Sequence, residues 1–162
     1  MNSPIDIIRA ANRKEPIRIE LELPGGIKCW MHLPNKHQIS DVREKLYRIA
    51  YAEACELGLA GKPINQAEFD QLKSLPNYEK MDAPRDLAEQ YAIAQSLTQI
   101  IYNLLPGLIR DDAGEEIFPA LAEKREFLAI VRNDLALEAM LIAKWTDIFQ
   151  TQQEVAEHAK NS

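Results

Sequence analysis

The sequence predicts a mainly α protein of the α+β class, a helical bundle of about five or six helices with one N-terminal antiparallel β-hairpin. Two patterns carry this prediction. Apolar residues recur every three or four positions through most of the chain, as they do on one face of a helix. Residues 17–33 instead alternate between apolar and polar side chains, which is typical of strands. At 162 residues, we expect one globular domain over residues 1–149, followed by a polar C-terminal tail, residues 150–162, that frays.

A short helix is expected at the N-terminus. Ser3 is a good N-cap and Pro4 a good first residue, because the first turn of a helix does not use the N–H that proline lacks. Asp6 can interact with the positive end of the helix dipole. The polar run 12–15 ends the helix. Its expected buried side consists of Ile5, Ile8 and Ala11.

The hairpin pattern predicts a register as well as two strands. A three-residue loop, Pro24-Gly25-Gly26, puts every apolar side chain of residues 17–33 on one face. A two-residue loop would set an apolar face against a polar one. With the longer loop, a type I turn with left-handed Gly26 is expected, and the paired residues are Leu23 with Ile27, Leu21 with Cys29, Ile19 with Met31, Ile17 with Leu33, and Glu22 with Lys28.

Two further helices are expected before the middle of the chain. Ser40 should begin a helix over residues 41–57 that ends at Gly58, the usual left-handed C-terminal cap. Asn65 should cap a short helix that ends before Pro76, with Glu68 completing a capping box. The core stripe of the first helix is predicted to be Val42, Leu46, Ile49, Ala50, Ala54 and Leu57.

The strongest helical signal spans residues 84–105. Pro84 suits its first turn, and Pro106-Gly107 is expected to stop it. Two adjacent rows of apolar residues give it a face wider than one neighbouring helix requires. We therefore expect this helix to lie at the centre of the core, with the hairpin and the other helices packed on it.

The last third of the chain begins with a turn at Asp112-Ala113-Gly114 and is otherwise helical. Asn133-Asp134 is a point at which the helical run can break into two. Its apolar residues include a row with a seven-residue spacing, consisting of Leu121, Leu128, Leu135, Ile142 and Phe149.

Residues with metal or catalytic chemistry are sparse. Cys29 and His32 lie three positions apart on a predicted strand and so point to opposite faces, which disfavours a zinc site with His37. The acidic residues of segment 111–116 lack the spacing of an EF-hand loop. Phosphate-loop, dinucleotide and nucleophile-elbow motifs are absent from the sequence. We expect no enzyme and no cofactor.

Composition limits the partners. A net charge of −6 disfavours nucleic acid, and no apolar run approaches the length of a membrane span. Two cysteines suit reduced thiols in a cytosol. Protein partners remain, with self-association left open. The residues expected to bind them, which are alternatively part of the core, are Ile101, Tyr102, Leu105, Leu135, Ile142, Trp145 and Phe149.

The order of these elements resembles the tail assembly chaperones of long-tailed bacteriophages. The turn at 111–118, DDAGEEIF, followed by a Leu-rich helix, carries the resemblance. It implies a non-enzymatic protein of the host cytoplasm, absent from the mature virion. Such a protein keeps the helical tape-measure protein soluble and helps to recruit tail-tube subunits. The alternative is a small inhibitor or adaptor that binds one folded host protein.

Overall fold

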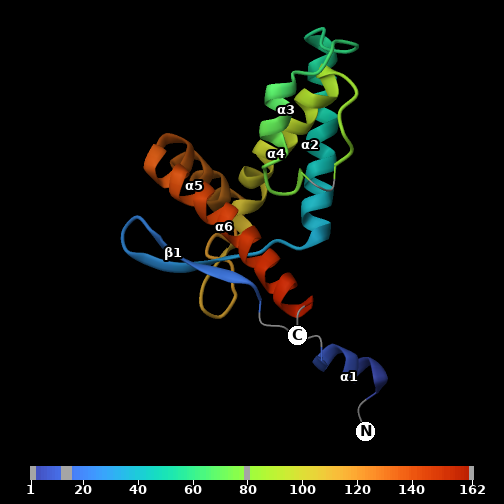
Figure 1. The fold of residues 1–162 in the computed structure, drawn as a ribbon. Coiled ribbons are helices and arrows are strands. Elements are labelled where there is room, and N and C mark those ends of the chain that lie inside the picture. The colour runs from blue at the N-terminus through green and yellow to red at the C-terminus, as the bar shows by residue number, and fades with distance from the viewer. Residues whose placement is uncertain (1–2, 12–15, 79–80, 161–162) are drawn as a thin grey trace.

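The computed structural model describes residues 3–11, 16–78 and 81–160. As predicted, the protein is mainly α with a small antiparallel sheet whose hairpin is N-terminal. Figure 1 shows α2, α3 and α4 grouped together, with α5 and α6 beside the sheet. The elements are α1 (Pro4–Ala11), β1 (Arg18–Leu23), β2 (Ile27–His32), α2 (Lys36–Glu56), α3 (Gln66–Leu72), α4 (Leu87–Leu108), β3 (Ile109–Arg110), α5 (Leu121–Asn133) and α6 (Leu135–Lys160).

The hairpin has the predicted three-residue loop and the predicted register. Leu21 pairs with Cys29, and Leu23 pairs with Ile27. The expected type I turn is wrong. Gly25 has a φ of 87°, which belongs to the third residue of a type II turn, and Gly26 N–H donates to the Leu23 carbonyl at 3.2 Å. Pro24 suits the second position of either turn type, so proline alone did not distinguish them.

A third strand, not predicted from the sequence, completes the sheet. β3 pairs antiparallel with β2, so that Ile109 lies beside Met31 and Arg110 beside Trp30. After β3 the chain reverses through the predicted turn. There the Asp111 carboxylate accepts hydrogen bonds from the N–H groups of Ala113 and Glu115, both at 2.9 Å. Two residues are too few to show an alternating pattern, and this is why the strand escaped prediction.

The long helix α4 starts and ends later than expected. Asp86 caps its N-terminus, where the carboxylate accepts from Glu89 N–H at 2.9 Å, so Pro84 precedes the helix. Pro106 lies inside the helix and does not stop it. Pro106 removes one helical hydrogen bond, but both it and Leu108 are buried. Their burial offsets that loss, so α4 continues to Leu108 and β3 begins at the next residue.

Two apolar clusters lie along α4 and confirm its central place. The minor core consists of Leu72, Ile93 and Leu97, with Tyr47, Leu75 and Tyr78 packed against it. The main core joins the second half of α4 to the sheet, α5 and α6. Its buried residues are Leu21, Leu23, Cys29, Met31, Ile39, Ile100, Ile101, Leu105, Leu108, Ile109, Phe127, Val131, Leu137, Leu141, Trp145 and Ile148.

Helix α2 begins earlier than Ser40. Asn35 and Gln38 form a complete capping box, with Asn35 Oδ1 accepting from Gln38 N–H at 2.8 Å and Gln38 Oε1 accepting from Asn35 N–H at 3.0 Å. α2 then packs along α4. Its predicted stripe is partly wrong, because Ile49 and Leu57 are both exposed.

The N-terminal cap of α3 uses a different partner from the one predicted. Asn65 Oδ1 accepts from Glu68 N–H at 3.2 Å as expected. The Glu68 side chain does not return the bond. Instead, buried Gln90 of α4 accepts from Asn65 N–H at 2.9 Å and donates to the Asn65 carbonyl at 3.1 Å. The short helix is therefore held to α4 by a polar clamp as well as by Leu72.

The C-terminal helices break at Asp134, close to the predicted position. Asp134 Oδ1 accepts from Leu137 N–H at 3.1 Å and so caps α6. The seven-residue row is not the buried face, because Leu121, Leu135 and Ile142 are exposed. The described part of the expected tail is helical, since α6 continues to Lys160.

Helix α1 forms with the predicted cap. Ser3 Oγ accepts from Asp6 N–H at 3.2 Å. The helix lies apart from the rest of the fold, below the open end of the hairpin (Figure 1). Ile5 and Ile8, expected on its buried side, are exposed, as is Ile7. The side chain of Ala11 and the polar run 12–15 lie outside the described residues.

Candidate functional site

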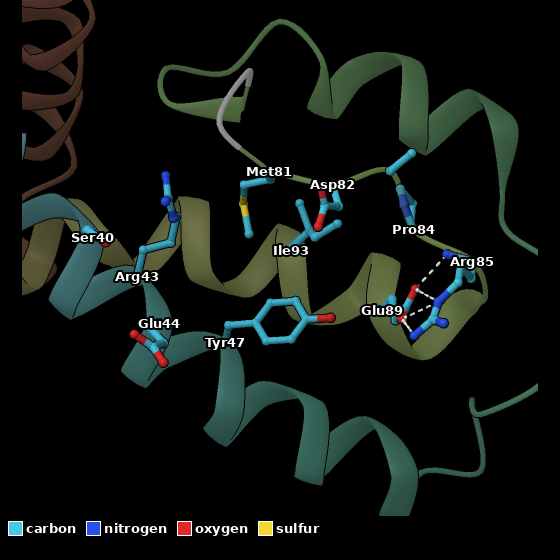
Figure 2. Close-up of a pocket in the computed structure, with 11 residues that line it drawn as sticks. Ser40, Arg43, Glu44, Tyr47, Met81, Asp82, Pro84, Arg85, Glu89 and Ile93 are labelled. Carbon is cyan, nitrogen blue, oxygen red and sulfur yellow. Dashed lines mark hydrogen bonds and ion pairs between the residues drawn. The ribbon is translucent and has the colours of Figure 1, made fainter.

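A polar pocket of about 730 Å³ lies between α2, α4 and the segment that precedes α4 (Figure 2). Helix α2 contributes Arg43, Glu44 and Tyr47 at helical spacing, which puts these side chains on the side that faces α4. Helix α4 contributes Glu89 and Ile93. The remaining wall is formed by Met81, Asp82, Ala83, Pro84 and Arg85.

An ion pair closes one end of the polar pocket. Arg85 Nη2 lies 2.8 Å from Glu89 Oε1, and the Arg85 N–H donates to Glu89 Oε2 at 2.6 Å. These hydrogen bonds lower the pKa of Glu89, so its carboxylate stays ionised near neutral pH. Burial raises the pKa of Tyr47, which stays protonated. Both groups are therefore shifted away from the range useful for proton transfer at neutral pH.

Arg43 is the unsatisfied group of this pocket. Its Nη1 atom is buried, and within the described part of the chain it has no hydrogen-bond partner. Figure 2 shows the side chain extending along the pocket wall towards Met81. A buried donor without an acceptor costs about 1–3 kcal/mol. With Glu44, Asp82 and Glu89 also on the walls, the pocket mixes both signs of charge and favours no one class of charged ligand.

An apolar groove of about 360 Å³ lies between the hairpin turn and α5. We call it the hairpin groove. Its lining is mainly apolar and includes two exposed glutamates. The lining residues are Leu23, Pro24, Ile27, Phe118, Glu123, Glu126, Phe127, Ile130 and Leu137.

The three-residue turn and the helical spacing of α5 together build the hairpin groove. The turn ends β1 at Leu23 and starts β2 at Ile27, so these residues lie opposite each other. Phe127 stacks on Phe118 with their ring centroids 4.5 Å apart, which fixes one wall. Ile27 and Ile130 are exposed on the two sides. Glu123 and Glu126 precede Phe127 and Ile130 on α5 and form an acidic rim.

The hairpin groove has the features of a helix-binding site. Apolar grooves that take amphipathic helices present carbon surfaces to anchor side chains spaced three and four residues apart. Exposed Ile27 and Ile130 give such anchors a partner on each wall. The acidic rim would favour basic residues beside those anchors.

The seven predicted partner-binding residues fall into two groups. Ile101, Leu105 and Trp145 are buried in the main core, with Tyr102 and Phe149 packed against it. Trp145 and Phe149 meet edge to face with ring centroids 5.0 Å apart. These five residues therefore contribute to the main core, which was the alternative interpretation of the pattern. Leu135 is 82% exposed and Ile142 is also exposed, whereas Tyr102 and Phe149 are half-buried.

Sequence reasoning missed the residues of the hairpin groove. The sequence pattern places Leu23 and Ile27 on the apolar hairpin face, and Phe127 and Ile130 do not belong to the seven-residue row. A signal was nevertheless present, because Phe127, Ile130 and Val131 recur at helical spacing on α5. What the sequence lacked was the pairing of that face with the hairpin turn.

The metal candidates are dispersed in the structure. Cys29 faces the main core, while His32 lies on the other face of β2 and is half-buried. Burial, followed by the charges of Arg110 and Arg18, lowers the pKa of His32. Among the described residues, no group of three or more His, Cys, Asp or Glu side chains is arranged to hold a metal ion.

No helix in the described ranges is both long enough and apolar enough to cross a membrane. No protein-family model, curated protein or solved structure significantly matches the chain.

Proposed function

We propose that this protein is a non-catalytic assembly chaperone that holds an amphipathic helix of a partner protein in the hairpin groove. The observation that supports the proposal is the groove itself, an open apolar surface between Ile27 and Ile130 with a glutamate rim. Exposed apolar surface on a small acidic protein is characteristic of a site that is covered on binding. The net charge of −6 keeps the complex soluble.

The partner that we favour is the tape-measure protein of a long-tailed bacteriophage. The DDAGEEIF turn and the element order resemble the tail assembly chaperones, which act on this partner and on tail-tube subunits in the host cytoplasm. A long helical protein exposes repeated apolar faces before the tail assembles, and such faces aggregate. Binding them reversibly requires an apolar groove and no catalytic group.

Co-expression tests this function. The tape-measure protein of a long-tailed bacteriophage should remain soluble when it is produced with the wild-type chain. Ile130→Asp places a charge on the groove wall and should abolish the effect, because loss of one central anchor weakens binding by about 2 kcal/mol or more, roughly 30-fold. Ile49→Asp is the matched control, since Ile49 is 58% exposed and Ile130 is 57% exposed.

Equal solubilisation by the Ile130→Asp and Ile49→Asp variants would refute the groove as the binding site. A tape-measure protein that stays insoluble with the wild-type chain would refute the proposed function. If the wild-type chain instead forms one defined complex with a folded host protein, the inhibitor or adaptor alternative is supported.

A further inference from the structure

Helix α1 has an apolar face that its own chain leaves uncovered. Ile5, Ile7 and Ile8 are each more than half exposed, and on a helical wheel they share one side, opposite Asp6. The helix has only 8 residues. Isolated helices shorter than about 12–15 residues are marginal in water, so α1 needs a surface to pack on if it is to persist.

The charge of this N-terminal segment complements the hairpin groove. Residues 3–16 contain Arg9, Arg13 and Lys14 against two acidic residues, in a protein whose total charge is −6. The groove carries Glu123 and Glu126 on its edge. The adjoining hollow beside the turn adds Glu22 and Asp134. An amphipathic helix followed by basic residues therefore matches an apolar groove with an acidic rim.

The covalent geometry favours a groove on another molecule. Ile17 is fixed at the open end of the hairpin, where its carbonyl accepts from Leu33 N–H at 2.9 Å. The groove lies at the turn end, about 20 Å away at the rise of a strand. The six Cα–Cα steps from Ala11 to Ile17 span at most about 22 Å. Only a fully extended linker running back along the hairpin would bring α1 to its own groove, and a second copy has no such restriction.

We propose that α1 of one copy lies in the hairpin groove of a second copy, with Ile5 and Ile8 against Ile27, Phe127 and Ile130. This association covers two apolar surfaces at once. It concerns the same groove as the proposed function but does not depend on the identity of the client, that is, the helical partner held there. It implies that a client must displace α1, so self-association and client binding exclude each other.

Cross-linking between two variants, each with one introduced cysteine beside the buried Cys29, tests the docking. In a Cys55→Ser background, which removes the exposed cysteine, Ile8→Cys is mixed with Ile130→Cys and oxidised with diamide. We expect disulfide-linked dimers to form on the order of tenfold faster than with Ile49→Cys, because docking raises the local concentration of the two thiols. Ile49 matches Ile130 in exposure but lies on α2.

Equal rates with Ile130→Cys and Ile49→Cys would overturn the proposal. So would the double variant Ile8→Cys/Ile130→Cys if it closed within one chain at a rate independent of protein concentration, because α1 would then occupy its own groove. Sedimentation velocity gives a second readout, in which Ile8→Asp should shift the wild-type oligomer to monomer. Ile8→Asp should still solubilise the client, so failure of α1 docking and failure of the proposed function are distinguishable.

Discussion

Two adjacent residues of α6 offer a sharp test of which side of that helix is buried. Leu141 belongs to the main core and is 1% exposed, whereas Ile142 is 41% exposed and belongs to the seven-residue row. Leu141→Ala removes buried methyl groups and leaves a cavity, which costs about 2–5 kcal/mol. Ile142→Ala removes three carbons, each worth about 0.8 kcal/mol when fully buried. Because Ile142 is partly exposed and opens no closed cavity, we expect a loss of about 1 kcal/mol.

Urea unfolding followed by circular dichroism measures both losses. In a thermal melt of a chain of this size, a loss of about 3 kcal/mol corresponds to a fall in Tm of about 6–12 °C, and a loss of about 1 kcal/mol to a fall of about 2–4 °C. The two variants should share one m-value, since neither changes the surface exposed on unfolding by much. A larger loss for Ile142→Ala than for Leu141→Ala would refute the assignment of the buried face and restore the seven-residue row as the core stripe.

Three other substitutions test separate parts of the structure. Gln90→Leu keeps a side chain of similar size but removes the two hydrogen bonds to Asn65. We expect calorimetry to show a free energy of unfolding lower by about 1–3 kcal/mol. An unchanged value would show that these hydrogen bonds are not formed. Gly26→Ala should cost about 1–2 kcal/mol, because Gly26 has a φ of 74° and a left-handed conformation strains alanine. If Gly26→Ala unfolds at the wild-type midpoint, the turn geometry is wrong. Burial lowers the pKa of His32 below its ordinary 6.5, and the charges of Arg110 and Arg18 lower it further. Protonation of His32 therefore favours the unfolded chain, and the free energy of unfolding should fall as the pH drops below about 6.5. His32→Gln should reduce that fall in a pH series of thermal melts, and an unchanged pH profile would contradict the lowered pKa.

The hairpin could be predicted from the sequence in detail because its information is local. With a period of two, only one loop length puts all apolar residues on one face, so pattern alone determines the register of Leu21 with Cys29. The caps at Ser3 and Asn65 were equally local. The break at Asp134 was also visible, since Asn and Asp favour helix ends.

Other features depend on contacts between distant parts of the chain. The seven-residue row seemed continuous in the sequence, but it lies beside the buried side of both helices, where Phe127, Leu141 and Ile148 contact the core. Pro106 continues α4 because its surroundings bury it. Gln90 completes the cap of α3 from a different helix. Tertiary packing overrides local propensity at each of these positions.

The residues of the hairpin groove could not be predicted from the sequence for the same reason. Leu23 and Ile130 lie far apart in the sequence, and each belongs to a pattern that already has a structural explanation. Only the fold places the turn beside α5. The polar pocket could not be predicted either, because its walls come from α2, α4 and the segment between α3 and α4.

Amide hydrogen exchange on a client complex tests the helix-in-groove proposal most directly. The Ile8→Asp variant should be used, so that α1 does not compete, with the tape-measure protein as client. We expect added protection at the hairpin turn, residues 23–27, and along α5 and the start of α6, residues 123–137. The polar pocket around Arg43 and Glu89 should exchange as in the free protein. Protection confined to that pocket, with no change at 23–27 and 123–137, would contradict the proposal.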